Sequence, residues 1–126
     1  MNHMKQTRPF SLRARLRSVK FAYEGIETFF SAQHNAVIHG YFTAFVFMAA
    51  IFFKVSTTEL VMLALAAGFV WSAEIFNTAI EAMMDHLSPE KHPRVKYIKD
   101  LAAAGVLVAA ITAAVTGLII FIPKLF

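Results

Sequence analysis

The sequence has no cysteine, few glycines and few charged residues. The first two shortages each exclude a class of chemistry. Without cysteine the chain can form neither a disulfide nor a thiolate metal site. Its five glycines are isolated along the chain, which excludes a phosphate-binding loop of the Walker type. Its five histidines show no spacing typical of a transition-metal site. We therefore expect His34 and His39 to be structural or solvated.

Three long apolar runs dominate what is present. Of the 126 residues, 58% are hydrophobic and only 16% are charged, which is more apolar than an ordinary soluble domain. The runs are Ala36–Phe53, Leu60–Ala73 continued as Ile75–Ile80 after Glu74, and Leu101–Ile122. Each approaches or reaches the roughly 20 residues that cross a bilayer as a helix. The first run starts too late for a signal peptide. These features predict a single-domain, all-α membrane protein.

Lysine and arginine indicate the orientation of these spans. Ten of the twelve precede the first run or lie between the second and third runs: Lys5, Arg8, Arg13, Arg15, Arg17, Lys20, Lys91, Arg94, Lys96 and Lys99. Only Lys54 and Lys124 lie on the other side. The positive-inside rule places the N-terminus in the cytoplasm and the C-terminus outside. The net charge of +4 then favours anionic lipid and gives no support to nucleic-acid binding.

An amphipathic helix is predicted before the first span. Apolar side chains recur there at spacings of three and four: Leu12, Leu16, Val19, Tyr23, Ile26 and Phe30. Most basic residues lie off this stripe, as expected for a helix in the headgroup layer. It is either a plain anchor or the wall of a lipid site, with Glu24 and Glu27 reaching toward the headgroups. The predicted bounds are disorder over 1–9, this helix over 10–32, spans over 36–53, 60–85 and 100–122, and a cytoplasmic loop over 86–99.

The most informative feature is a polar stripe at the end of the second span. Glu74, Asn77, Glu81 and Asp85 stand at i, i+3, i+7 and i+11. They fall within an arc of roughly 80° on one helix face. Carboxylates at membrane depth are costly, so they face a protein interior or a wet cavity. A divalent metal carrying an anionic substrate would compensate their charge.

The surroundings of this stripe predict an assembly. Three helices cannot alone shield a carboxylate stripe from lipid, so we expect subunits to associate with the site between them. Lys99 lies at the bilayer edge, about where the stripe emerges, whereas Arg94 and Lys96 are expected to mark topology only.

Residues 74–85, Glu-Ile-Phe-Asn-Thr-Ala-Ile-Glu-Ala-Met-Met-Asp, resemble the signature of prokaryotic diacylglycerol kinases and their undecaprenol kinase relatives. That signature is Glu-x-apolar-Asn-Ser/Thr-Ala-apolar-Glu-x-x-x-Asp. The resemblance extends through Ser88–Pro93 and Lys99-Asp100, and it includes Phe21–Gly25 and His34–His39. It covers the chain from about residue 12 onward.

The resemblance implies a homotrimeric inner-membrane kinase with active sites between subunits. Such an enzyme transfers the γ-phosphoryl group of MgATP to a lipid hydroxyl, of diacylglycerol or undecaprenol. Glu74 is implied as the general base, Glu81 as the magnesium ligand, and Asn77, Asp85 and Glu24 as supporting residues. The implied nucleotide contacts are Phe21, Gln33, Glu81, Glu90, Lys91, His92, Lys99 and Asp100.

Two positions depart from the family pattern. Gln33 stands where a second metal-binding glutamate is common, and Val37 stands where arginine is frequent. A neutral amide can still bind magnesium through its oxygen. Three explanations stay open: one carboxylate suffices, Glu24 or Glu27 substitutes, or the activity is weak.

An alternative function is a small proton- or cation-coupled transporter or membrane assembly subunit, with the carboxylates relaying ions. That function needs neither the Ser88–Pro93 loop nor Lys99, which favours the kinase.

Overall fold

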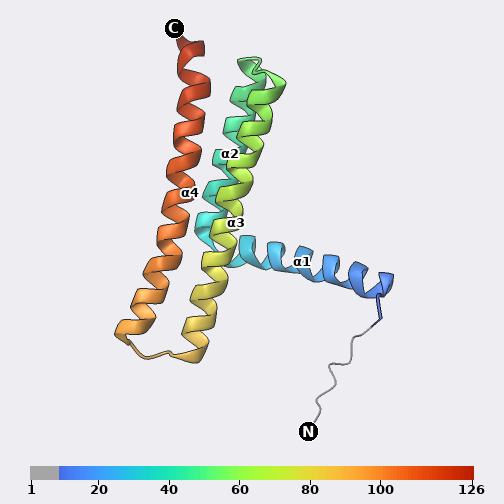
Figure 1. The fold of residues 1–126 in the computed structure, drawn as a ribbon, viewed down its shortest axis with the longest axis vertical. Coiled ribbons are helices and arrows are strands. Elements are labelled where there is room, and N and C mark those ends of the chain that lie inside the picture. The colour runs from blue at the N-terminus through green and yellow to red at the C-terminus, as the bar shows by residue number, and fades with distance from the viewer. Residues whose placement is uncertain (1–8) are drawn as a thin grey trace. The chain divides into compact units, whose positions relative to one another are not determined.

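The computed structural model describes residues 9–126, which fold into four α-helices and no strand. In chain order they are α1 (Leu12–Ala32), α2 (His34–Phe52), α3 (Thr57–Leu87) and α4 (Pro93–Leu125) (Figure 1). The all-helical class is confirmed, and α2, α3 and α4 are each long and apolar enough to cross a membrane. Of the predicted disorder over residues 1–9, residues 1–8 lie outside the described part of the chain.

The chain divides into two compact units, Met1–Val37 and Ile38–Phe126. In the first unit α1 begins after Ser11, whose side-chain oxygen accepts a hydrogen bond from the Ala14 N–H at 3.3 Å. This N-cap satisfies one of the free amides of the first turn. The helix ends at Ala32, where the Gln33 N–H donates to the Phe29 carbonyl.

In the second unit a tight turn joins α2 to α3. Lys54 adopts a positive φ of 52°, and its N–H donates to the Ile51 carbonyl. The Val55 N–H donates to the Ala50 carbonyl, which completes a Schellman motif. Glycine usually occupies the left-handed position of this motif, so Lys54 is an uncommon choice. The turn makes α2 and α3 antiparallel.

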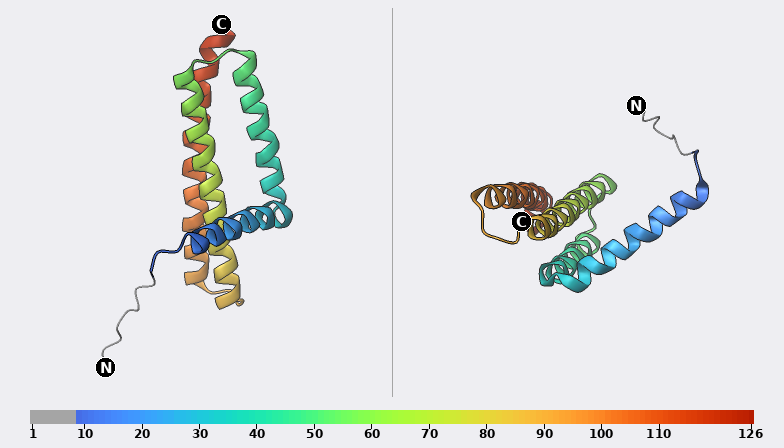
Figure 2. Two further views of the ribbon diagram at one scale, coloured as in Figure 1. Left: turned by 90° about the vertical axis from the view of Figure 1, so that its right-hand side faces the viewer. Right: turned by 90° about the horizontal axis from the view of Figure 1, so that it is seen from below.

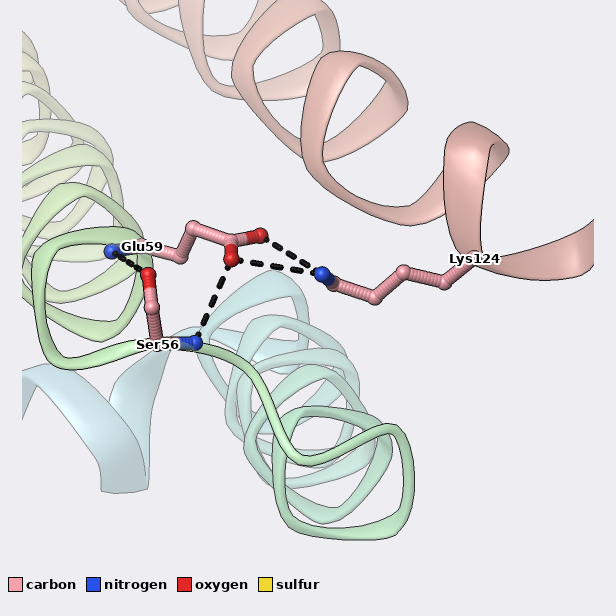
Figure 3. Close-up of polar contacts among 3 residues, drawn as sticks. All are labelled: Ser56, Glu59 and Lys124. Atoms are coloured by element: carbon pink, nitrogen blue, oxygen red, sulfur yellow. Dashed lines mark hydrogen bonds and ion pairs between the residues drawn. The ribbon is translucent and has the colours of Figure 1, made fainter.

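A capping box starts α3, and the end of α4 joins it (Figure 3). The Ser56 Oγ accepts from the Glu59 N–H, and Glu59 Oε1 accepts from the Ser56 N–H, both at 3.2 Å. Lys124 Nζ lies 3.0 Å from Glu59 Oε2 and donates to Oε1 at 3.2 Å. Both charged side chains are about a quarter exposed. The carboxylate of Glu59 therefore links the start of α3 to the end of α4.

The connection between α3 and α4 is shorter than the predicted loop over residues 86–99. Only residues 88–92 separate the helices, because α4 begins seven residues before the predicted span. Pro93 is favourable in a first helical turn, and His92 Nδ1 caps the helix by accepting from the Arg94 N–H at 3.1 Å. This loop lies at one end of the α3–α4 hairpin, opposite the α2–α3 turn and the C-terminus (Figure 1).

Helices α3 and α4 pack side by side, whereas α2 stands apart from α3 along much of its length (Figure 2). The three helices share a small core near the α2–α3 turn, formed by Ala50, Leu63 and Ile120. Most other large apolar side chains are exposed. At 1.5 Å per residue, α3 and α4 are about 46 and 50 Å long, which exceeds the ~30 Å hydrocarbon core. Part of each helix must therefore lie outside that layer.

Candidate active site

The predicted polar stripe lies on α3 and runs toward the loop over residues 88–92. Glu74, Asn77 and Glu81 are partly buried, whereas Asp85, the last member, is exposed. Glu74 and Glu81 are separated by about 10 Å along the helix axis. The stripe thus leads from a sheltered position within the bundle to the end of the hairpin that carries the loop.

Glu74 meets a histidine from the neighbouring helix. His39 Nε2, on α2, lies 2.8 Å from Glu74 Oε1. The Glu74 side chain is 15% exposed and that of His39 is 33% exposed. From the sequence, His39 was expected to be structural or solvated, and its pairing with Glu74 was missed. The available signal was that His39 is the only residue of the first apolar run whose side chain can carry a charge near neutral pH.

A hydrogen-bonded pair lies next to this contact. Trp71 Nε1 on α3 donates to Thr43 Oγ1 on α2 at 3.1 Å, and Thr43 Oγ1 donates to the His39 carbonyl at 2.7 Å. The rings of Trp71 and His39 meet edge to face, with centroids 6.2 Å apart. Trp71 therefore joins α2 to α3 through a polar contact as well as through packing.

The donor set of the stripe suits a magnesium ion that arrives on a phosphate. Asn77 Oδ1 is buried and, within residues 9–126, accepts no hydrogen bond, so an oxygen ligand remains available one helical turn from Glu81. In the described part of the chain, no three His, Asp or Glu side chains gather as a metal site. Magnesium typically takes one or two carboxylates and completes its shell with water and substrate phosphates. Glu81 and Asn77 fit that pattern.

The Asp85 end of the stripe opens into a pocket of about 670 Å³, a size within the usual range for small-molecule sites. Its walls include Asp85, Glu90, Lys91, His92, Lys96, Lys99 and Asp100. Lys99 Nζ lies 2.5 Å from Asp85 Oδ1, and the charge of Glu81 also acts on it. Lys96 pairs with Asp100 at 2.5 Å on a more exposed surface. The structure therefore gathers all five nucleotide contacts that were expected from the loop and the start of α4.

The remaining predicted site residues, Phe21, Glu24 and Gln33, belong to the first compact unit. Glu24 lies 4.0 Å from Lys20, one turn away on α1, and both side chains are more than half exposed. Gln33 caps the C-terminal end of α1 and is partly buried.

Comparison with known proteins identifies the class. Residues 20–121 match the model of a family described as prokaryotic diacylglycerol kinase, so the chain belongs to this family of membrane lipid kinases. An undecaprenol kinase from Bacillus subtilis is 33% identical over 109 residues, which are 86% of this chain and 89% of the relative. A diacylglycerol kinase from Synechocystis sp. is 33% identical over 111 residues, 87% of this chain. The match spans 63% of that relative's length. The resemblance inferred from residues 74–85 is confirmed.

Proposed function

We propose that this chain transfers the γ-phosphoryl group of MgATP to the hydroxyl of a membrane lipid. The observation that carries the proposal is the α3 stripe, which joins the sheltered carboxylate of Glu74 to the loop pocket where Lys99 meets Asp85. Phosphoryl transfer requires positioned reactants and cationic charge at the phosphates rather than covalent chemistry by the protein. Glu74, at the sheltered end of the stripe, would position the lipid hydroxyl. Lys99, at the pocket end, would supply the cationic charge for the phosphates.

The proposed roles follow the stripe. Glu74 accepts the proton of the lipid hydroxyl while the hydroxyl oxygen forms a bond to the γ-phosphorus. The bond from that phosphorus to the β–γ bridging oxygen breaks, and ADP leaves. Lys99 stabilises the charge that develops on the phosphates. The loop residues Glu90, Lys91 and His92, together with Asp100, hold the nucleotide.

Magnesium, when bound, neutralises charge on the β- and γ-phosphate oxygens. Glu81 would hold it, with the amide oxygen of Asn77 one turn away as a further donor. By the family resemblance, Gln33 is a further candidate ligand with a neutral amide oxygen.

The site is proposed to be completed in a homotrimer in the inner membrane. A single chain leaves most large apolar side chains of α2, α3 and α4 exposed, and lipid and neighbouring subunits can cover them. The apolar stripe of α1 is also exposed: Leu12, Leu16, Val19, Tyr23, Ile26 and Phe30. A helix with such a stripe and adjacent basic residues suits the membrane surface.

We expect the loop pocket to face the cytoplasm, because ATP is supplied there. A reporter inserted near Lys91 should read as cytoplasmic, and one fused after Phe126 should read as external. The two positions lie at opposite ends of the α3–α4 hairpin (Figure 1). Paired alkaline phosphatase and fluorescent-protein fusions measure this. An external reading at Lys91 would contradict both the charge distribution and the proposed chemistry.

Removing the Lys99 ammonium should weaken catalysis and nucleotide binding together. Lys99→Ala should lower kcat about ten- to a hundredfold and raise the KM for ATP, because the lost charge acts on both ground-state and developing phosphate charge. Arg94→Ala is the matched control: it removes a cation from the same N-terminal part of α4, and its side chain does not line the pocket. Steady-state kinetics on both variants decide the matter. Small, equal effects would remove Lys99 from the ATP site.

A substrate panel tests the function itself. Purified protein in lipid is supplied with MgATP and, separately, diacylglycerol, undecaprenol or a ceramide-like lipid, and phosphorylated product is measured. Diacylglycerol and undecaprenol are the substrates in the names of the two relatives. Product from either supports the proposal and names the substrate. ATP left unconsumed with every lipid, in a folded and assembled protein, would overturn it in favour of a non-enzymatic role for the carboxylates.

A further inference from the structure

The contact of Glu74 with His39 has a role in the reaction that the proposed roles above do not include. Glu74 is the least exposed of the ion-paired carboxylates described in residues 9–126, and its partner comes from a different helix. A general base works only when it is held within hydrogen-bond reach of the proton that it removes. The side chain of glutamate has several rotatable bonds, so some other group must restrict it.

His39 is itself restricted. Its carbonyl accepts the Thr43 hydroxyl at 2.7 Å, and Thr43 in turn accepts the Trp71 indole N–H at 3.1 Å. The edge-to-face contact with Trp71 limits the orientation of the imidazole ring. Trp71 and Glu74 stand one turn apart on α3, and His39 and Thr43 one turn apart on α2. The four side chains therefore tie the two helices together at the level of Glu74, where α2 otherwise stands apart from α3 (Figure 2).

We propose that His39 is a positioning residue for Glu74. Resting on the proposed function of Glu74 as the base, this inference assigns one carboxylate oxygen, Oε1, to His39 and leaves Oε2 for the lipid hydroxyl. Trp71, which donates to the Thr43 hydroxyl, packs against the imidazole and limits its orientation. His39 does not line the nucleotide pocket and contacts Glu74, so we expect its effect to reach the reaction through Glu74.

The first test separates positioning from a structural role. His39→Leu keeps the size of the side chain and removes its polar atoms, and it should lower kcat by roughly 10- to 100-fold, the effect of misplacing a reacting group. The KM for ATP should stay within about twofold, because the nucleotide pocket is untouched. His39→Gln, which keeps a polar side chain able to reach Glu74, should recover most of the lost kcat. Thr43→Val should give a smaller loss, again in kcat. His86→Leu, the same substitution at an exposed histidine of α3 outside the pocket, is the control and should match wild type.

The second test is a double-mutant cycle with Glu74→Gln. If His39 acts through Glu74, adding His39→Leu to Glu74→Gln should lower kcat no further. If the double variant lowers kcat by the product of the two single effects, or if His39→Leu keeps the wild-type kcat, the inference is overturned and Glu74 remains the base. Full activity of Glu74→Gln alone would instead overturn the proposed function of Glu74. Thermal unfolding and oligomer size are measured for every variant, and if His39→Leu does not assemble, Thr43→Val, which also lowers kcat, is combined with Glu74→Gln in the same cycle.

Discussion

Glu74→Gln should lower turnover by two to four orders of magnitude while the protein still assembles and binds ATP. The amide has nearly the same shape as the carboxylate but cannot accept the proton of the lipid hydroxyl, and a positioned base contributes about 10²- to 10⁴-fold. Since the nucleotide pocket lies at the other end of the stripe, the KM for ATP should change little. Single-turnover and steady-state assays with the lipid identified in the substrate panel measure the loss.

Glu59→Gln is the matched control for this variant. It makes the same chemical change on the same helix, at the end of α3 that pairs with Lys124 rather than within the polar stripe. It should lower the thermal stability and leave turnover close to wild type. Wild-type turnover of a folded Glu74→Gln protein would end the assignment of Glu74 as the base.

Glu81→Ala should abolish activity, and added magnesium should restore little of it. Glu81 is the one carboxylate on the stripe that is both partly buried and adjacent to the charge of Lys99, so its loss removes the metal ligand and leaves Lys99 with one acidic neighbour fewer. Activity is measured over a range of magnesium concentrations. A Glu81→Ala protein that regains wild-type turnover in high magnesium would show that the ion is held mainly elsewhere.

Gln33→Glu tests the same metal site by adding a carboxylate, whereas Glu81→Ala removes one. It adds a second carboxylate at the position where the resemblance implies one, so activity should stay intact or rise, with a lower magnesium requirement. Strong inactivation by Gln33→Glu would mean that Gln33 has a role other than binding the metal.

The sequence predicts the parts of this molecule that depend on one helix at a time. The three spans follow from apolar runs, and the stripe from Glu74 to Asp85 follows from helical spacing, so both could be placed without coordinates. Helix α4 begins at Pro93, before the predicted span over 100–122, because that span was located from apolarity and residues 93–99 are mostly polar or charged. A helix extends along the chain as far as its backbone hydrogen bonds continue and begins where a residue such as His92 caps it, whatever the polarity of its surface.

Contacts between helices could not be predicted in this way. The spacing of His39 within the first run gives its own face on α2 but not the rotation of α2 relative to α3, which decides whether it meets Glu74. Lys124 likewise counted only as a marker of topology, although the structure pairs it with Glu59. Pairings of this kind depend on the packing of one helix against another, and single-sequence periodicity carries no information about that packing.

The pairing of Glu59 with Lys124 can form only late in the synthesis of the α3–α4 hairpin. The two residues are 65 positions apart, one at the beginning and one at the end of the α3–α4 hairpin. During synthesis Lys124 leaves the ribosome after Glu59 and after almost the whole α3–α4 hairpin. The contact can therefore form only after α3 and nearly all of α4 have been synthesised. A chain truncated before Lys124 would keep α3 and all but the last two residues of α4, and it would lack this connection between them.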